Sequence, residues 1–366
     1  MTEVTHSRAP AAATGTSAGL PGRRGWALPV LLALLLLVAV VVSIGFGAYP
    51  MSFGRAMRLF WETLWPFSGN PTPDLAAIRE QTVVAVIRPP RILVATFCGV
   101  ALGLAGTALQ GMMRNPLIGP DLVGVSGGAA FGGVLAMLMN WPIAAVIALA
   151  TAGGVGAMLC TLALARLVSE RNDGIPLILA GFFVGAFFLA GVGLLKSLPL
   201  EYSWKLPGIV YWLLGSFRGA DPTKVWVIAV PTLVGGAVLI LLRWRMNLLS
   251  LGDLDAASLG IDVRWLRWAI IGIVTIMVAA QVAVSGVVGW VGLVIPHFAR
   301  MLVGPDHRRL VPTAALLGGL YVLLLDNLTR TMSGGELPVG VLSAFFGTPM
   351  LCFLFWKTQT RGWSGS

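Results

Sequence analysis

Charged side chains are scarce in this sequence of 366 residues, of which Asp, Glu, Lys and Arg together make up only 11%. An average soluble domain carries about 25% charged residues. Apolar residues reach 57% here, and the mean hydropathy is +0.86. A chain this apolar has too few polar residues to cover the surface of a soluble core. The composition therefore excludes a soluble globular protein and favours one that lies in a membrane.

Residue types that carry chemistry are also few. The sequence has three cysteines without a CxxC spacing, three histidines without an HExxH motif, and four lysines, none of which follows a glycine. These absences exclude a compact Cys/His metal site and the phosphate-binding loop of an ATPase. No set of nucleophile, base and acid can be assembled either. We therefore expect a chain that is not an enzyme, and we attribute its net charge of +10 to loops at a membrane surface, not to nucleic-acid binding.

Long apolar runs are what the sequence does contain, and they predict an all-α integral membrane protein of about ten transmembrane helices. Residues 1–24 are predicted to form a disordered cytoplasmic tail, 25–357 one polytopic membrane domain, and 358–366 a cytoplasmic C-terminal tail. Residues 49–88 are expected to form an interfacial helix and loop. The runs cover about residues 26–48, 90–111, 120–139, 142–167, 176–197, 225–243, 265–288, 289–303, 310–328 and 338–356.

Basic residues fall unevenly between the two sides when the runs are threaded alternately. With both termini in the cytoplasm, fifteen of the twenty-five basic residues lie inside, which follows the positive-inside rule. Arg88 and Arg91, at the outer start of the second run, break this bias. They either anchor to lipid headgroups or pair with acidic residues of an extracytoplasmic protein. Asp326 and Arg330 are spaced to pair along one helix.

The most polar inner loop covers residues 246–263. We expect two short helices, broken at Gly252 and ended at Gly260, with Asp253 and Asp255 near the start of the second. This pattern fits either an amphipathic linker or a docking element for a cytoplasmic partner. The inner turn after the second run, Arg114 to Asp121, contains two prolines and a glycine, and it is typical of either a plain turn or a gate.

Five segments together resemble the permease subunit of type II ABC importers, which take up ferric siderophores, haem, cobalamin and related chelates. The resemblance covers about residues 25–357. The segments are RPPR (88–91), ALQGMMRNPLIGPDLVGVSGGA (108–129), ASLG (257–260), GWVGLVIPHFARMLVGPDHRRLVP (289–312) and ELPVGVLSAFFGTP (336–349).

The resemblance implies a homodimer in the bacterial inner membrane, two cytoplasmic ABC ATPase subunits that bind ATP and Mg²⁺, and one periplasmic substrate-binding protein. It implies no cofactor in this chain itself. Arg88, Arg91 and Arg330 would dock the binding protein by salt bridges. The cytoplasmic gate would include Asn115, Leu117, Gly174 and Ile175, although the last two lack the hydroxyl that the family has there. Coupling to the ATPase would fall to Leu251, Gly252, Asp253, Ala257, Leu259 and Gly260.

The cargo is left open by these residues. A ferric siderophore or haem is the first expectation, and cobalamin or molybdate is the alternative within the same importer type. A second class, an ion-coupled secondary transporter, would need carboxylates in the middle of the membrane. The Asp and Glu residues of this sequence fall almost wholly in predicted loops or span ends.

Overall fold

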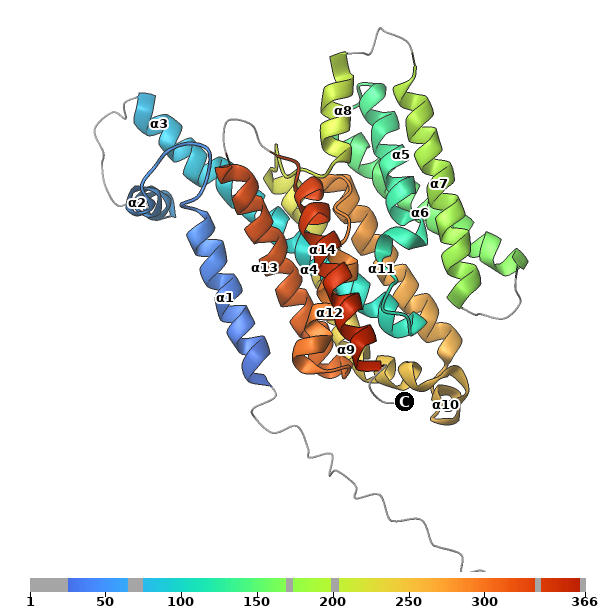
Figure 1. Ribbon diagram of the computed structural model, residues 1–366. Coiled ribbons are helices and arrows are strands. Elements are labelled where there is room, and N and C mark those ends of the chain that lie inside the picture. Colours follow the sequence, from blue (N-terminus) through green and yellow to red (C-terminus); the bar gives the residue numbers. More distant parts are fainter. Residues whose placement is uncertain (1–25, 65–74, 169–173, 199–203, 333–336, 363–366) are drawn as a thin grey trace, which may run out of the picture.

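The computed structural model describes residues 26–64, 75–168, 174–198, 204–332 and 337–362, and the regular elements in these ranges are all helices. The predicted tail 1–24 lies outside the described residues. The structure confirms the all-helical membrane fold (Figure 1). The helices are α1 (Ala27–Ser43), α2 (Phe53–Leu64), α3 (Leu75–Thr82), α4 (Arg88–Met113), α5 (Val125–Leu138), α6 (Ile143–Val168), α7 (Gly174–Lys196), α8 (Leu206–Leu213), α9 (Pro222–Leu251), α10 (Asp253–Ser258), α11 (Val263–Ser285), α12 (Val291–Val303), α13 (His307–Thr331) and α14 (Val339–Gly362).

Ten of the described helices are apolar, and six of these are long enough to cross a membrane. The other four, α1, α5, α12 and the described apolar part of α14, are shorter. At about 1.5 Å per residue, the 14 residues of α5 span only about 21 Å of a hydrocarbon layer about 30 Å thick. Irregular backbone therefore completes the crossing before α5, where the short helix η3 (Pro120–Val123) follows the turn after α4.

Two span boundaries differ from the sequence prediction. The first helix ends at Ser43, not near residue 48, because the carbonyls of Ile44, Phe46 and Tyr49 leave the helical pattern and accept hydrogen bonds from arginine side chains. The second span begins earlier than predicted. Helix α3 runs through a π-helical turn, η2 (Val83–Ile87), directly into α4. The interfacial segment thus includes the extension of a membrane helix.

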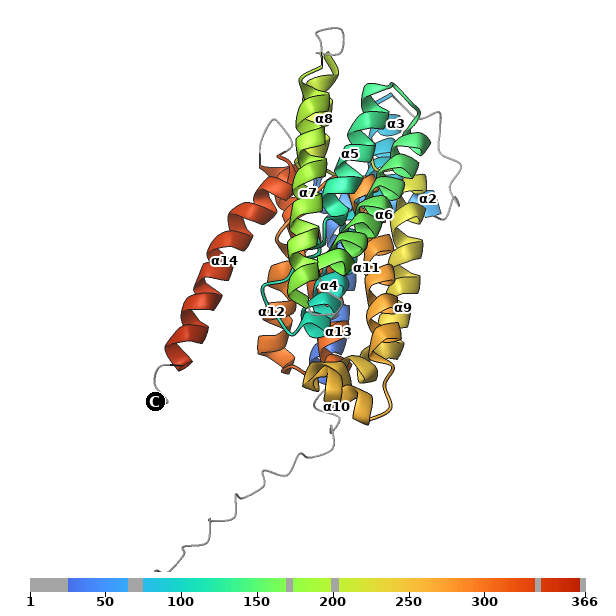
Figure 2. The same ribbon diagram turned by 90° about the vertical axis from the view of Figure 1, so that its right-hand side faces the viewer.

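Helix α4 forms the centre of the subunit and packs against α9, α11, α12 and α13 (Figures 1 and 2). Most residues of α4 are buried, on all sides of the helix, which agrees with its lack of a polar face. Small residues allow these helices to approach closely. Gly99 of α4 lies against Gly318 of α13, and a Cβ atom added to either glycine would overlap the carbonyl oxygen of the other.

The two ends of the helical bundle carry different elements. Helices α2, α3 and α8 lie at one end, and α10 lies at the other end, where α1 and α13 begin (Figure 1). The arginine-rich turns around α10 identify that end as the cytoplasmic one under the positive-inside rule. Helix α14 leans away from the other helices toward its C-terminus (Figure 2).

We predict that Gly99→Ala lowers the stability of the subunit by about 1–3 kcal/mol, because the new methyl group forces α4 and α13 apart. The matched control is Gly272→Ala in α11, where no atom lies within 4 Å of the new methyl group. The midpoint of thermal unfolding in detergent should fall for the first variant and stay or rise for the second. Equal midpoints would contradict the close packing of these two helices.

Candidate functional site

The three outer arginines that the sequence singled out lie together at the outer ends of α4 and α13. Their exposed fractions are 3% for Arg88, 7% for Arg91 and 6% for Arg330. Asp326, which is fully buried, lies between two of them: its carboxylate is 2.9 Å from Arg91 Nη2 and 3.1 Å from Arg330 Nε. The pairing predicted between Asp326 and Arg330 is confirmed. We call these four residues the outer arginine cluster.

The loop that follows α1 covers the outer arginine cluster with main-chain oxygens. Arg88 donates hydrogen bonds to the carbonyls of Ile44 (2.6 Å) and Tyr49 (3.2 Å). Arg330 donates to the carbonyl of Phe46 (3.0 Å), and it also donates to Asn327 Oδ1. The arginines therefore hold the 44–49 loop to α4 and α13 in this conformation. Docking of another protein by these arginines stays a prediction, and it requires the loop to uncover them.

The predicted gate residues lie in a turn with defined hydrogen bonds. Helix α4 ends at Arg114, whose backbone is left-handed (φ 52°). The Leu117 N–H donates to Asn115 Oδ1 (2.9 Å), and the Asn115 N–H donates to the Gln110 carbonyl (3.3 Å). The side chain of Leu117 is exposed. The other two predicted gate residues, Gly174 and Ile175, begin helix α7, and their surroundings lie outside what the structure describes.

The inner loop differs from its prediction in one respect. Residues 246–251, expected as a separate short helix, are the last turns of α9, so only α10 is a short helix of its own. Gly252 (φ 138°) interrupts the helix between α9 and α10, and Gly260 (φ 81°) ends the segment, as predicted. Both angles favour glycine because a Cβ atom is strained there. Leu251, Ala257 and Leu259, three of the predicted coupling residues, are exposed at this end of the bundle.

Asp253 connects the predicted coupling segment to the predicted gate, a link that sequence reasoning missed. Its Oδ1 atom lies 3.4 Å from Arg114 Nη2, at the end of α4, and 2.8 Å from Arg267 Nη2, on α11. Asp253 is the first residue of α10, and Arg114 directly precedes Asn115. One carboxylate therefore joins α10 both to the end of α4 and to α11. The sequence held both charges but gave no sign that these two inner loops meet.

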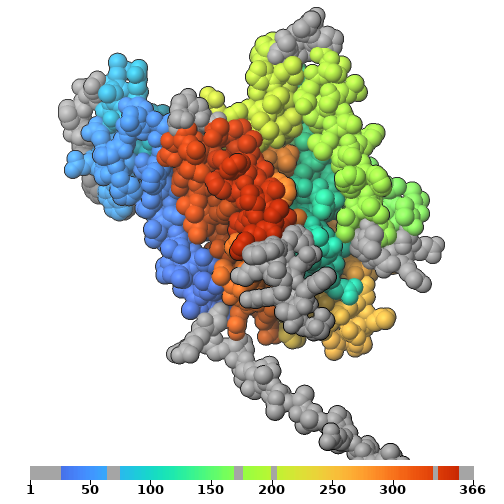
Figure 3. All heavy atoms as spheres, viewed as in Figure 1, coloured from blue at the N-terminus to red at the C-terminus, as the bar shows by residue number. Residues whose placement is uncertain are grey.

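A hollow of about 200 Å³ lies between the η3–α5 segment and α7. It is lined by Asp121 and Ser126, whose hydroxyl donates to Asp121 Oδ1 (2.7 Å), and by small and apolar residues of α7 such as Gly181 and Phe182. Side chains of the α4–α5 region reach the surface between α14 and α7 (Figure 3). The sequence places its acidic residues almost wholly in loops or span ends. Asp121 lies in such a segment, but the fold brings it beside the membrane helix α7.

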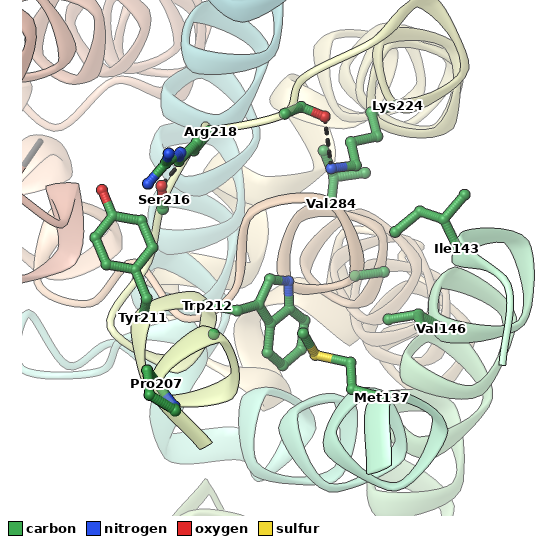
Figure 4. Close-up of a pocket in the computed structure, with 13 residues that line it drawn as sticks. Met137, Ile143, Val146, Pro207, Tyr211, Trp212, Ser216, Arg218, Lys224 and Val284 are labelled. Carbon is green, nitrogen blue, oxygen red and sulfur yellow. Dashed lines mark hydrogen bonds between the residues drawn. The ribbon is translucent and has the colours of Figure 1, made fainter. Parts of the chain in front are cut away.

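A larger cavity of about 540 Å³ opens near the outer end, between α5, α6, α8 and α11. Trp212 and Met137 lie on its apolar side, and Arg218 and Lys224 lie at its edge (Figure 4). Lys224 Nζ donates to the Gly219 carbonyl (2.8 Å), so its charge is turned toward the protein backbone. Sequence reasoning did not find this cavity, because its residues come from segments as far apart in the sequence as Met137 and Val284.

Comparisons with known proteins agree with the fold and with these segments. The FecCD transport family matches residues 35–357. The molybdate import permease MolB of Haemophilus influenzae is 39% identical over 331 residues, which cover 90% of this chain and 96% of MolB. The hemin transport permease HmuU of Yersinia pestis is 35% identical over 344 residues, covering 91% of this chain and 97% of HmuU.

A solved structure has the same fold at high similarity. It is an inward-facing conformation of an ABC transporter assigned to the metal-chelate type, and it matches with a TM-score of 0.77 and 38% identity over 90% of this chain and 99% of that one. The chain described here belongs to the FecCD transport family. It is therefore a multi-pass membrane permease of a bacterial ABC importer and not itself an ATPase, and its family implies ATPase and binding-protein partners.

We predict that Asp326→Asn lowers stability by about 3–5 kcal/mol, because it leaves the buried Arg91 and Arg330 charges without their carboxylate. The control is Glu80→Gln, which removes an ion pair with the exposed Arg55 and should cost about 1 kcal/mol or less. Thermal unfolding of both purified variants tests the difference. Similar losses in the two would show that burial does not set the strength of the outer arginine cluster.

Proposed function

We propose that two copies of this chain form the membrane channel of an importer that carries a metal chelate, a ferric siderophore or haem, into the cytoplasm. A periplasmic binding protein would supply the affinity for the cargo, and two cytoplasmic ATPases would supply the energy. The permease itself would hold the cargo weakly. The observation that carries this proposal is the contact of Asp253 with both Arg114 and Arg267, because it gives an ATPase bound at α10 a direct mechanical route to the gate.

The proposed dimer face comprises α7 and α14. Helix α7 exposes Phe182, Phe183 and Phe187, and α14 exposes Phe345 and Phe346. Aromatic side chains contribute large apolar contact areas at interfaces. Helix α14 packs against the rest of its own subunit mainly through α12 and α13, and it leans away from them (Figure 2). A second copy would complete the packing on this side.

The proposed pathway runs along this face past the hollow at Asp121. The hollow has small residues on α7, one carboxylate and one hydroxyl, so it offers few polar contacts to a cargo. Below it, the gate turn at Asn115 and Leu117 would close the cytoplasmic end. When the ATPases bind ATP, their closure would displace α10, and the ion pairs of Asp253 would transmit that displacement to the turn. A shift of this kind requires that the partner bind the two conformations with different affinity.

Molybdate is the second candidate cargo, because the 39% identical MolB is a molybdate permease. The chelate is the first candidate because the 35% identical HmuU is a hemin permease and the 38% identical solved structure is of the metal-chelate type. Cobalamin is a further candidate, because a 32% identical relative is a cobalamin import permease.

The proposal is tested in liposomes that hold the permease, with the ATPase and ATP inside and the binding protein outside. We expect uptake of a ⁵⁵Fe-labelled siderophore or of haem that requires ATP and the binding protein, and no uptake of ⁹⁹Mo-labelled molybdate. Molybdate uptake alone would assign the chain to the second cargo. Uptake driven by a proton or sodium gradient without the ATPase would place it among secondary transporters.

We predict that Asp253→Asn leaves the permease–ATPase complex assembled but lowers transport per hydrolysed ATP at least tenfold, because α10 loses its charged contacts with Arg114 and Arg267. The matched control is Asp255→Asn, on the same helix, whose exposed carboxylate forms no ion pair with a described residue. ATP hydrolysis and cargo uptake are measured together on purified complexes. Normal coupling in the Asp253 variant would overturn the proposed route.

A further inference from the structure

Two arginine–tryptophan pairs meet at the cytoplasmic end of α1, α9 and α13. The Arg243 guanidinium lies over the Trp26 ring, 5.7 Å from its centre, and the Arg308 guanidinium lies over the Trp244 ring at 4.1 Å. Arg243 and Trp244 are consecutive residues of α9, so the two pairs are neighbours. We call these four residues the inner arginine–tryptophan patch. Nothing in the transport mechanism above uses it.

The patch lies where the lipid-facing surface changes from apolar to polar. Leu241, one turn above on α9, is 80% exposed, and Trp244 is 50% exposed. Trp26 is also exposed, and it directly precedes the apolar helix α1. Tryptophan prefers the level of the lipid headgroups, because its ring is apolar and its N–H is polar. The patch therefore lies at the headgroup level of the cytoplasmic leaflet.

The two arginines have donors that a phosphate can accept. A guanidinium donates its hydrogen bonds in its own plane, so an indole below its face does not occupy the donors at its edge. Neither Arg243 nor Arg308 forms a side-chain ion pair with a described residue. Both are half-buried, which restricts their motion before a ligand binds. Two such guanidinium groups, carried by the neighbouring helices α9 and α13, have the donors that the oxygens of a phosphodiester accept.

One carboxylate, Asp306, lies near the patch and is already engaged. Its Oδ1 accepts hydrogen bonds from the Arg308 N–H (2.9 Å) and from Asn247 Nδ2 (2.6 Å). The bond from the Arg308 N–H caps the start of α13. Burial alone would raise the pKa of Asp306, but these hydrogen bonds and the charges of Arg308 and Arg309 lower it. Asp306 thus stays ionised as a helix cap, and its carboxylate forms no salt bridge with the Arg308 guanidinium, both residues being in the described part of the chain.

We propose that the inner arginine–tryptophan patch is a binding site for the headgroup of an anionic phospholipid. The phosphodiester lies between the edges of Arg243 and Arg308, and the acyl chains lie along the exposed apolar faces of α1 and α9. A bound lipid would bridge α1, α9 and α13 at this end of the subunit. The site is independent of the cargo and of the proposed coupling route.

The test uses the full chain in detergent and counts retained lipids by native mass spectrometry after addition of phosphatidylglycerol or phosphatidylcholine. We expect one phosphatidylglycerol to be retained tightly and phosphatidylcholine not to be. Arg243→Gln with Arg308→Gln should weaken that binding about 30-fold, from about 1 kcal/mol per arginine at an anionic surface and 1.4 kcal/mol per factor of ten. The control is Arg166→Gln, which removes an arginine over Trp268 on a different side of the subunit and should leave the retained lipid in place.

Three results would overturn this proposal. They are unchanged phosphatidylglycerol retention in the double variant, equal retention of phosphatidylcholine, and displacement of the lipid by glycerol phosphate at the same phosphate concentration. The last would mean that the patch recognises a free phosphate and not a lipid. Unfolding midpoints in phosphatidylcholine nanodiscs, which should match between wild type and the double variant, show that any loss of binding is not a loss of fold. A variant with lysine at both positions retains the charges but not the planar forks and should bind with intermediate affinity.

Discussion

A hydrocarbon solvent cannot satisfy polar groups, and this constraint governs most of the structure. In the outer arginine cluster, protein atoms supply the hydrogen bonds and ion pairs that water would otherwise supply to the buried charges. Asp326 lies between Arg91 and Arg330, and the main-chain oxygens of the 44–49 loop take the donors of Arg88 and Arg330. The irregular backbone between α4 and α5 is likewise tolerated, because it packs within protein and beside a hollow.

The same constraint separates the structural parts from the moving parts. The centre of the subunit is held by close contact of small residues, as at Gly99 and Gly318, which leaves little freedom between α4 and α13. The cytoplasmic end is held differently, by the partly exposed ion pairs of Asp253. Exposed ion pairs are weak and easily rearranged. The molecule is thus rigid where helices cross and adjustable where the ATPase is expected.

The sequence predicted the number and approximate positions of the apolar helices, because twenty-residue apolar runs have one stable form in lipid. It also predicted the breaks at Gly252 and Gly260, because glycine favours those backbone angles. It did not predict the burial of Arg88 and Arg91, since Arg88 binds main-chain carbonyls 39 and 44 positions away and Arg91 binds a carboxylate 235 positions away. The Asp253–Arg114 contact and the cavity near Trp212 were missed for the same reason: each joins segments that only the folded chain brings together.

The hold of Arg88 and Arg330 on the 44–49 loop has a consequence for how this region can diverge. A carbonyl oxygen is common to every amino acid, so substitutions at Ile44, Phe46 or Tyr49 preserve the acceptors. Gly47 differs, because a Cβ atom there would crowd the Arg88 guanidinium. An insertion or deletion would move all the acceptors at once. We therefore expect the amino acids of this loop to tolerate substitution. Its length is constrained, because the carbonyls must stay within hydrogen-bond distance of two guanidinium groups.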